Sequence, residues 1–334
     1  KSPKYGEKLK SNQVDWLGIF LLMAFIGSLQ YVLEHGQQDD WFNNKTIIIL
    51  STITVFGLVL FIWRELTYKR PVVNLGVLKD GNLRIGTVMC FILGFGLYGS
   101  TLIIPIYTQT ILGWTATDAG LLLIPGSITT AFMMPIVGKL LQRGVPQSYM
   151  VGLGFLIFFF FTYMMHNNMT PSTGVEHLYW GLILRGIGLG LLFVPITTLS
   201  LSTLKGKDIG EGAAFTGMMR QLGGSFGIAI ITTFITRFNQ EHRVNLVSHL
   251  DTTRLEVQQR VLTLQKGFMS KGFTANESLN KAYQVIDYSV MKQSAVLSYM
   301  DIFLYLGIMF LCCIPIILLI KKGKNTINPA DAMH

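Results

Sequence analysis

Uncharged, largely apolar stretches recur along the chain and set its organisation. A membrane-spanning helix needs about 20 consecutive apolar residues, because the ~30 Å hydrocarbon core offers no water to its backbone N–H and C=O groups. The predicted helices cover 16–33, 46–63, 85–110, 119–140, 149–166, 178–203, 211–236 and 299–320. The pattern therefore predicts an all-α polytopic membrane protein with eight transmembrane helices.

Basic residues gather at one end of the predicted helices. The connections at that end carry most of the Lys and Arg, including Arg64, Lys139 and Lys205, whereas the short loops at the other end hold only Lys45. Loops rich in Lys and Arg stay in the cytoplasm, so this side of the membrane is predicted to be the cytoplasm. Both termini of the chain are predicted to lie on the same side. The segment 237–298 carries eight Lys and Arg, but it has the length that this rule exempts.

Composition narrows the functional classes. Only 13% of the residues are charged, about half the usual share of a soluble domain, which excludes a water-soluble globular protein. The net charge of +9 is not clustered on one soluble surface, so we expect no nucleic-acid partner. The spans hold no set of His, Asp and Glu suited to a metal or to acid–base catalysis, and the cysteines form no Cys-x-x-Cys pair. We therefore predict neither an enzyme nor a bound cofactor or metal.

The segment 237–298 has a periodicity of its own. Apolar residues recur at helical spacing over Leu250, Val257, Val261, Leu264 and Phe268, and again over Tyr283, Ile286 and Val290. Gly267 and Gly272 separate the two runs, so we predict a helical hairpin standing outside the membrane. Two interpretations remain open, which are a lid packed on the protein's own outer surface and a docking site for a partner protein.

Four segments of the membrane part carry recognisable motifs. They are residues 15–42, residues 109–126 with Gln109-Thr110-Ile111-Leu112-Gly113-Trp114 and Ile124-Pro125-Gly126, the run Arg185-Gly186-Ile187-Gly188-Leu189-Gly190, and the run Arg220-Gln221-Leu222-Gly223-Gly224-Ser225-Phe226-Gly227. In order and spacing these segments resemble the fourteen-span drug:proton antiporters (EmrB/QacA type) of the major facilitator superfamily. Residues 15–42 resemble the first of the two extra spans of that family, residues 109–126 its seventh-to-eighth-span connection, and the last two runs its tenth and eleventh spans. The resemblance covers essentially the whole chain, as two extra spans followed by the second six-helix half.

This resemblance implies a secondary active transporter for proton-coupled multidrug efflux by alternating access in a bacterial inner membrane. The first residue is Lys1, so we expect this chain to be the C-terminal part and the N-terminal half, with most proton-coupling acids, to precede it. Implied partners are lipophilic or cationic small molecules, protons, membrane lipids and a periplasmic adaptor protein at 237–298. Export of a lipid, siderophore or amino acid on the same scaffold is the alternative, and a membrane-embedded enzyme or sensor is a more distant one.

The resemblance also divides the chain into parts. We expect residues 1–83 to hold the N-terminal stretch, the two extra spans and a cytoplasmic connection, and residues 84–236 to hold core spans seven to eleven. Residues 237–298 are then the extracytoplasmic loop, and 299–334 the last span with its tail.

Five residues are candidates for the substrate or proton pathway. Arg185 lies about two turns into a span, where a cation costs at least ~2.5 kcal/mol unless it pairs, snorkels or faces water. One interpretation is a cation that faces a cavity and pairs with substrate or proton-carrying carboxylates. The other is a structural residue that bonds helix ends or reaches the outer headgroups. Asp301 opens the predicted last span and can titrate, bond a neighbouring helix or cap the helix. Gln109 and Tyr107 can line a cavity, and Met218 offers an adaptable apolar lining.

A second group of residues is predicted to act in gating or packing. Gly138 and Arg143 belong to Gly138-Lys139-Leu140-Leu141-Gln142-Arg143-Gly144, which resembles a Gly-x-Leu-x-Asp-Arg-x-Gly loop of the family's first half. Gln142 stands in place of the acid, so we expect gating or packing there and no charge relay. Arg220 is expected to make an inner-gate ion pair or a headgroup contact. Gly-x-x-x-Gly spacing at Gly186 and Gly190, and at Gly223 and Gly227, favours close helix approach. The run 158–161, four consecutive Phe, is interpreted as lipid-exposed.

Overall fold

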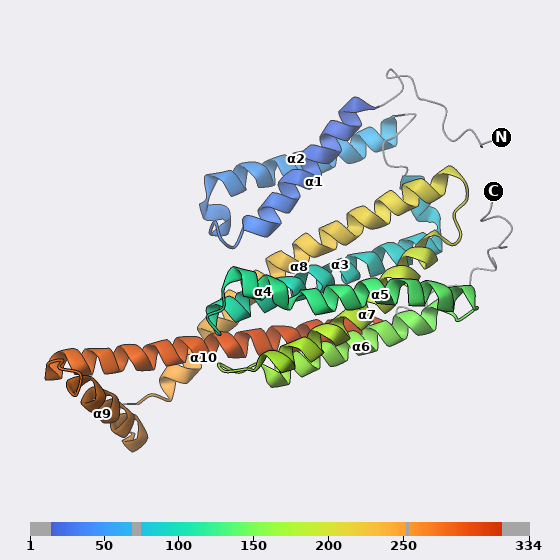
Figure 1. Cartoon of the computed structure of the whole chain (residues 1–334). Helices are drawn as coiled ribbons and strands as arrows, with labels where there is room; N and C mark the ends of the chain where they lie inside the picture. The colour runs from blue at the N-terminus through green and yellow to red at the C-terminus, as the bar shows by residue number, and fades with distance from the viewer. Residues whose placement is uncertain (1–14, 69–74, 252–253, 316–334) are drawn as a thin grey trace.

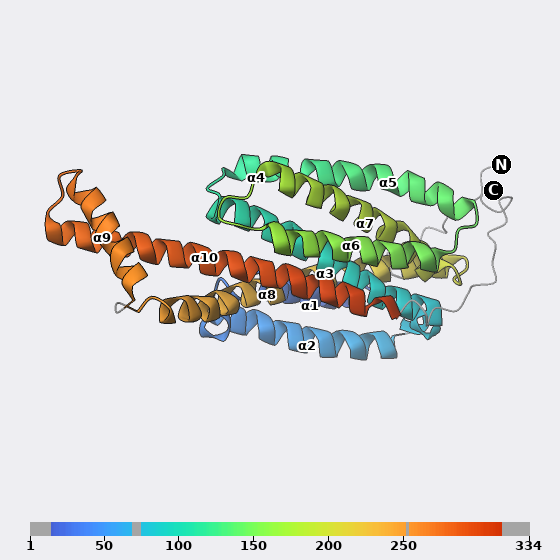
Figure 2. The same cartoon turned by 90° about the horizontal axis from the view of Figure 1, so that it is seen from below.

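The protein is described by a computed structural model that covers residues 15–68, 75–251 and 254–315. Within these ranges all regular structure is helical. Figures 1 and 2 show long helices lying side by side in a bundle, with α9 projecting beyond one end. The α-helices are α1 (Trp16–His35), α2 (Lys45–Thr67), α3 (Gly81–Thr110), α4 (Ala116–Leu122), α5 (Ile124–Gln142), α6 (Gln147–Asn168), α7 (Val175–Leu201), α8 (Lys207–Ser248), α9 (Leu255–Met269) and α10 (Ala275–Cys312).

Eight segments of the described chain are long and apolar enough to cross a membrane, with α4 and α5 counted as one segment, Ala116–Gln142. The break between α4 and α5 lies at Leu123, just before Pro125, which has no backbone N–H to continue the helical ladder. The predicted all-α fold with eight spans is therefore confirmed.

The main core lies between α3, α6, α7 and α10, where aromatic rings interlock. Phe158 of α6 stacks on Phe310 of α10 with 4.1 Å between ring centroids, and Phe161 meets Phe303 edge to face at 5.7 Å. Phe158 and Phe161 have no exposed surface, whereas Phe160 is exposed. The interpretation of the run 158–161 as lipid-exposed is therefore wrong for Phe158 and Phe161, because one face of α6 packs against α10.

Helices α8 and α10 extend much further than the sequence predicted. The predicted ends of helices at 236 and 299 are wrong, because α8 continues to Ser248 and α10 begins already at Ala275. Residues 237–248 contain no Gly or Pro to stop a helix. A capping box, in which Thr274 and Glu277 satisfy each other's backbone N–H groups, starts α10. Residues 316–320 of the predicted last span lie outside the described part.

The ends of the bundle differ in charge. The connection between α5 and α6, with Lys139 and Arg143 beside it, and the start of α8 lie at the end opposite to α9 (Figures 1 and 2). We call these the basic end and the α9 end. The assignment of the basic end to the cytoplasm stays a prediction.

Helices α1 and α2 form a hairpin of their own beside the rest of the bundle (Figure 1). At the basic end, the Arg64 guanidinium donates two hydrogen bonds of 3.1 Å to the Asp15 carboxylate, which also caps α1 through Gly18 N–H. Nearer the middle, the hydroxyls of Ser28 and Thr54 lie 2.8 Å apart. Because polar contacts join α1 and α2 at the basic end and near the middle, the two helices are held as a pair.

Candidate functional site

Arg185 lies in the interior of the bundle, where α7 packs on α3. Its exposed fraction is 5%. Its Nε donates to Ser100 Oγ at 2.9 Å, and its Nη2 donates to the carbonyl oxygen of Leu97 at 3.2 Å. Nη2 also donates to the hydroxyl of Thr101. Within the described residues no carboxylate forms an ion pair with Arg185, so neutral oxygens of α3 surround its charge.

The two hydroxyl groups are oriented to receive this cation. Ser100 Oγ donates its proton to the Gly96 carbonyl at 2.6 Å, and Thr101 Oγ1 donates to the Leu97 carbonyl at 2.6 Å. A hydroxyl that has given its proton to the helix backbone keeps its lone pairs for another donor. The α3 backbone therefore turns both hydroxyls into acceptors for the guanidinium. The role of Arg185 in a transport pathway stays a prediction.

Glycines lie where the helices of the bundle cross most closely. A Cβ added at Gly223 of α8 would lie within 3.0 Å of the carbonyl oxygen of Phe91 on α3, and one at Gly227 would lie 2.9 Å from that of Phe95. On α7, a Cβ at Gly186 would meet the backbone of α5, and one at Gly190 would lie 2.5 Å from Met133 Cβ. These four glycines thus allow close packing in two pairs of helices, α3 with α8 and α5 with α7.

The predicted gating residues at the basic end do not form one cluster. The guanidinium of Arg220, well inside α8, lies 4.5 Å from the ring centroid of Phe193 on α7. Among the described residues it makes a cation–π contact in place of an ion pair. Arg143 is exposed at the end of α5, where Gly144 turns the chain with φ of +86°. Gly138 lies on α5 with open space around its Cα.

Asp301 lies within α10 and pairs with a histidine of α8. The distance from His242 Nε2 to Asp301 Oδ2 is 2.7 Å, and both side chains are partly buried. The interpretation of Asp301 as a helix cap is wrong, because α10 begins at Ala275. From α6, His166 Nδ1 lies 2.8 Å from the carbonyl oxygen of Met300. Sequence reasoning missed His242 because it ended the α8 helix before this residue.

Tyr107 and Gln109 lie near the same end of the bundle but in different surroundings. Tyr107 is fully buried, and its hydroxyl donates to the Thr170 carbonyl at 2.6 Å, in the connection between α6 and α7. Its ring meets Tyr299 edge to face at 5.9 Å. Gln109 is exposed. The structure therefore buries Tyr107 against Tyr299 of α10 and leaves Gln109 at the surface.

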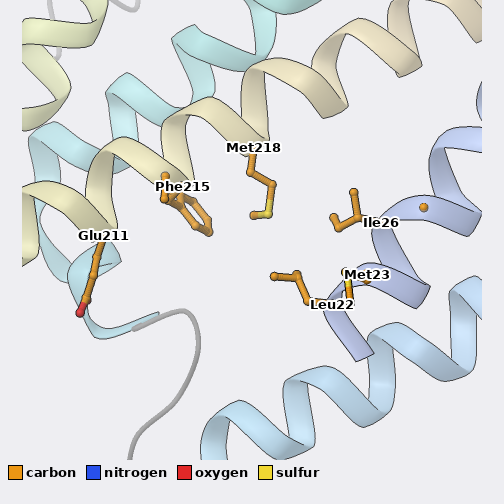
Figure 3. Close-up of a pocket in the computed structure, with 8 residues that line it drawn as sticks. Leu22, Met23, Ile26, Glu211, Phe215 and Met218 are labelled. Carbon is orange, nitrogen blue, oxygen red and sulfur yellow. The ribbon is translucent and has the colours of Figure 1, made fainter. Parts of the chain in front are cut away.

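Met218 lines a cavity of about 540 Å³ between α1 and α8. Phe215 and Met218 of α8 face Leu22 and Ile26 of α1 across this space, which we call the α1–α8 cavity (Figure 3). Apolar side chains dominate its lining, and Glu211 is the charged residue among them. Of the five pathway candidates, Met218 is the one that lines this cavity.

Eight candidate spans that pack closely at glycines define a polytopic membrane protein. Residues 11–228 match the family model of the Major Facilitator Superfamily, more than half of the chain. The chain belongs to this superfamily, whose members are transporters and not enzymes. The eight candidate spans are α1, α2, α3, α4 together with α5, α6, α7, α8 and α10, and the division into two extra spans and a second six-helix half stays a prediction.

Curated relatives are similar over much of the chain. The fatty acid resistance protein FarB of Neisseria gonorrhoeae is 30% identical over 308 residues, which are 92% of this chain and 59% of FarB. The multidrug export protein EmrB of Escherichia coli (strain K12) is 30% identical over 245 residues, which are 73% of this chain and 48% of EmrB. The chain thus spans about half to three fifths of the length of these relatives.

A solved structure was also found to be similar. A bacterial homologue of the human lysosomal transporter Spinster, in an inward-facing and occupied conformation, has a TM-score of 0.49 at 15% identity, over 91% of this chain and 69% of that one. The family assignment above rests on the sequence match and not on this similarity.

Proposed function

We propose that the protein is a proton-coupled exporter of lipophilic small molecules, with this chain as the C-terminal half of an alternating-access carrier in a bacterial inner membrane. The observation that carries the proposal is the match to the Major Facilitator Superfamily, together with relatives named for multidrug export and fatty acid resistance. Because the chain spans about half of EmrB, a first half is expected to complete the substrate path.

The helix packing supports a rocking mechanism. Glycine crossings hold α3 against α8 and α5 against α7, and Arg185 joins α7 to α3. Helices locked by such short crossings move together, as alternating access requires of one half of a carrier. We propose that this half rocks as one body, and that lipids cover the exposed apolar faces of α1 and α2.

We propose that the pair of Asp301 and His242 exchanges protons at the α9 end. His242 Nε2 and Asp301 Oδ2 lie 2.7 Å apart, within hydrogen-bond distance, and this contact joins α8 to α10. Protonation of both groups would break the charge attraction between the two helices. A conformational change and proton exchange can thereby be coupled.

The test uses the full-length protein in everted membrane vesicles, with ethidium uptake driven by a pH gradient. We expect uptake to stop when an uncoupler collapses the gradient, and Asp301→Asn to lower it several-fold. Asp287→Asn is the matched control, because Asp287 lies on the same helix in an exposed pair with Arg243. Uptake that is unaffected by the uncoupler would contradict proton coupling, and equal losses in both variants would contradict the role of Asp301.

A second candidate substrate is a long-chain fatty acid, favoured by the similarity to FarB over 92% of this chain. Cells that express the full-length protein should then tolerate palmitate better than cells with the empty vector. Tolerance to palmitate without any efflux of ethidium would favour the fatty acid over the drug.

We propose that this half alone does not transport. Cells that produce residues 1–334 without a complementing first half should show dye efflux at background. Efflux above background would contradict the proposal that both halves are needed for transport.

We further propose that the part of 237–298 that stands beyond the membrane binds a periplasmic adaptor protein. Helix α9 packs on α10 and leaves Leu255 and Leu262 exposed. Replacing 250–273 with a flexible linker of equal length removes α9 but keeps the capping box of α10. Capture of a co-expressed adaptor should then be lost. A substitution of the exposed Arg143 at the basic end is the control and should leave the capture unchanged. Undiminished capture would favour the interpretation of α9 as a lid.

A further inference from the structure

A hydrogen bond joins the α1–α2 hairpin to helix α8. Ser225 of α8 is buried, and its Oγ donates a hydrogen bond of 3.0 Å to Glu34 Oε1, in the last turn of α1 and near the α9 end of the bundle. Lipid tails are as apolar as Leu, so hydrogen bonds and close packing, and not a hydrophobic force, decide where two helices meet in a membrane. We therefore regard this contact as the point at which α1 docks on α8.

The α8 side of this contact is held firmly. Ser225 lies between Gly223 and Gly227, where α8 approaches the backbone of α3 most closely. A Cβ added at Gly224 would clash with the ring of Tyr98 on α3. Because α8 has no room to shift against α3 at this level, Ser225 is a fixed point on the helices around it.

The hairpin on the other side of the contact is a unit of its own. The ion pair of Arg64 with Asp15 joins α1 to α2 at the basic end, and the hydroxyls of Ser28 and Thr54 meet nearer the middle. A displacement of α1 therefore carries α2 with it.

Toward the basic end, α1 and α8 are held apart. The α1–α8 cavity of about 540 Å³ separates Leu22 and Ile26 of α1 from Met218 of α8 (Figure 3). On α1 its lining extends from Gly27 to Leu22, which lie about 10 and about 18 Å from Glu34 along the helix axis. Apolar side chains that face a cavity lack partner atoms on that side. The basic end of α1 is thus less tightly held against α8 than the α9 end.

We propose that the contact of Glu34 with Ser225 is a pivot on which the α1–α2 hairpin swings against α8. The hairpin stays docked at the α9 end while its basic end moves and changes the width of the α1–α8 cavity. Glu34 is then a positioning residue that holds the hairpin and touches no substrate. The link of this swing to transport rests on the proposed alternating access, but the pivot itself is measurable without transport.

The first experiment measures distances between spin labels on the full-length protein in nanodiscs by double electron–electron resonance. Labels at Trp63→Cys and Ile136→Cys report on the basic end, and labels at Ile49→Cys and Ile124→Cys report on the α9 end. All four residues are exposed, and each pair joins α2 to α5. The distance distribution should be broader for the basic-end pair than for the α9-end pair. Equal widths at the two ends overturn the pivot.

Two variants of Glu34 separate its hydrogen bond from its charge. Glu34→Gln keeps an acceptor oxygen for Ser225, so the distribution at the α9 end should stay narrow. Glu34→Ala removes the acceptor, so this distribution should broaden toward that of the basic end. Gln38→Ala is the matched control, because Gln38 is an exposed side chain four residues further along the hairpin. No broadening in Glu34→Ala, or the same broadening in Glu34→Gln or Gln38→Ala, overturns the role of the hydrogen bond.

A cross-linking experiment connects the pivot to transport. Leu22 and Ala214 line the α1–α8 cavity from its two helices, so a bismaleimide that joins Leu22→Cys to Ala214→Cys fixes the basic end of the hairpin. Ethidium uptake into everted vesicles should then fall several-fold. A disulfide between Ser28→Cys and Thr54→Cys lies within the hairpin and should leave uptake unchanged.

Uptake that survives the cross-link across the cavity overturns the swing, as does an equal loss with the disulfide inside the hairpin. Uptake that is absent even from the wild type contradicts the proposed export function and not the pivot, which the spin-label distances decide.

Discussion

The tight crossing of α3 and α8 gives a sharp test of the packing argument. In Gly223→Ala, the new methyl group would lie within 3.0 Å of the carbonyl oxygen of Phe91, whereas ordinary contacts begin at 3.4 Å. The obstacle is backbone and cannot rotate away, so the helices must separate. Overpacking of this kind costs about 1–3 kcal/mol, and the higher helix propensity of Ala returns up to about 1 kcal/mol.

We therefore expect Gly223→Ala to destabilise the protein by about 1–2 kcal/mol, and its thermal midpoint to fall by about 2–5 °C. The assay follows the reaction of Cys90 with a thiol-reactive fluorophore during heating of the detergent-solubilised protein. Cys90 has no exposed surface and precedes Phe91 on α3, so it reports on this interface. A Cys312→Ser background removes the exposed thiol.

Gly217→Ala is the matched control on the same helix. An added Cβ at Gly217 has nothing within 4 Å, so only the gain in helix propensity remains and the midpoint should stay equal or rise. If Gly223→Ala is as stable as Gly217→Ala, the close approach of α3 and α8 is refuted.

Three further predictions concern polar contacts. Arg185→Lys cannot reproduce the forked hydrogen bonds to α3, so it should cost about 1–3 kcal/mol in thermal unfolding, while Arg143→Lys at an exposed position should cost nothing measurable. Hydrogen bonds from Arg64 lower the pKa of Asp15, so the pair stabilises the fold above roughly pH 4 and loses this contribution as the pH falls further. Asp15→Asn should accordingly lower the midpoint at pH 7 and flatten its acid dependence, and an unchanged slope would contradict the pairing. Thr274→Ala removes a helix cap worth about 1 kcal/mol, which should speed hydrogen exchange in the first turn of α10 and not elsewhere.

Hydrophobic length determined the spans, because the backbone in a membrane must bond within its own helix and each span therefore has a fixed minimum length. All eight predicted spans correspond to helices. The spacing of Gly223 and Gly227 also indicated a small-residue face. The sequence did not say which helix meets that face, since α3 lies more than a hundred residues away along the chain.

Only the tertiary structure decided the surroundings of the polar groups. It joined Arg185 to the hydroxyls of α3 and carried α8 far enough to bring His242 to Asp301. It also separated the buried Phe158 from the exposed Phe160, two residues of one apolar run. Lipid and protein interior are equally apolar, so hydrophobicity marks a helix as embedded but does not tell its lipid face from its packed face. Which face of a helix is packed depends on which helices are its neighbours. The packing of α1 beside α8 likewise decided that Glu211 lines the α1–α8 cavity.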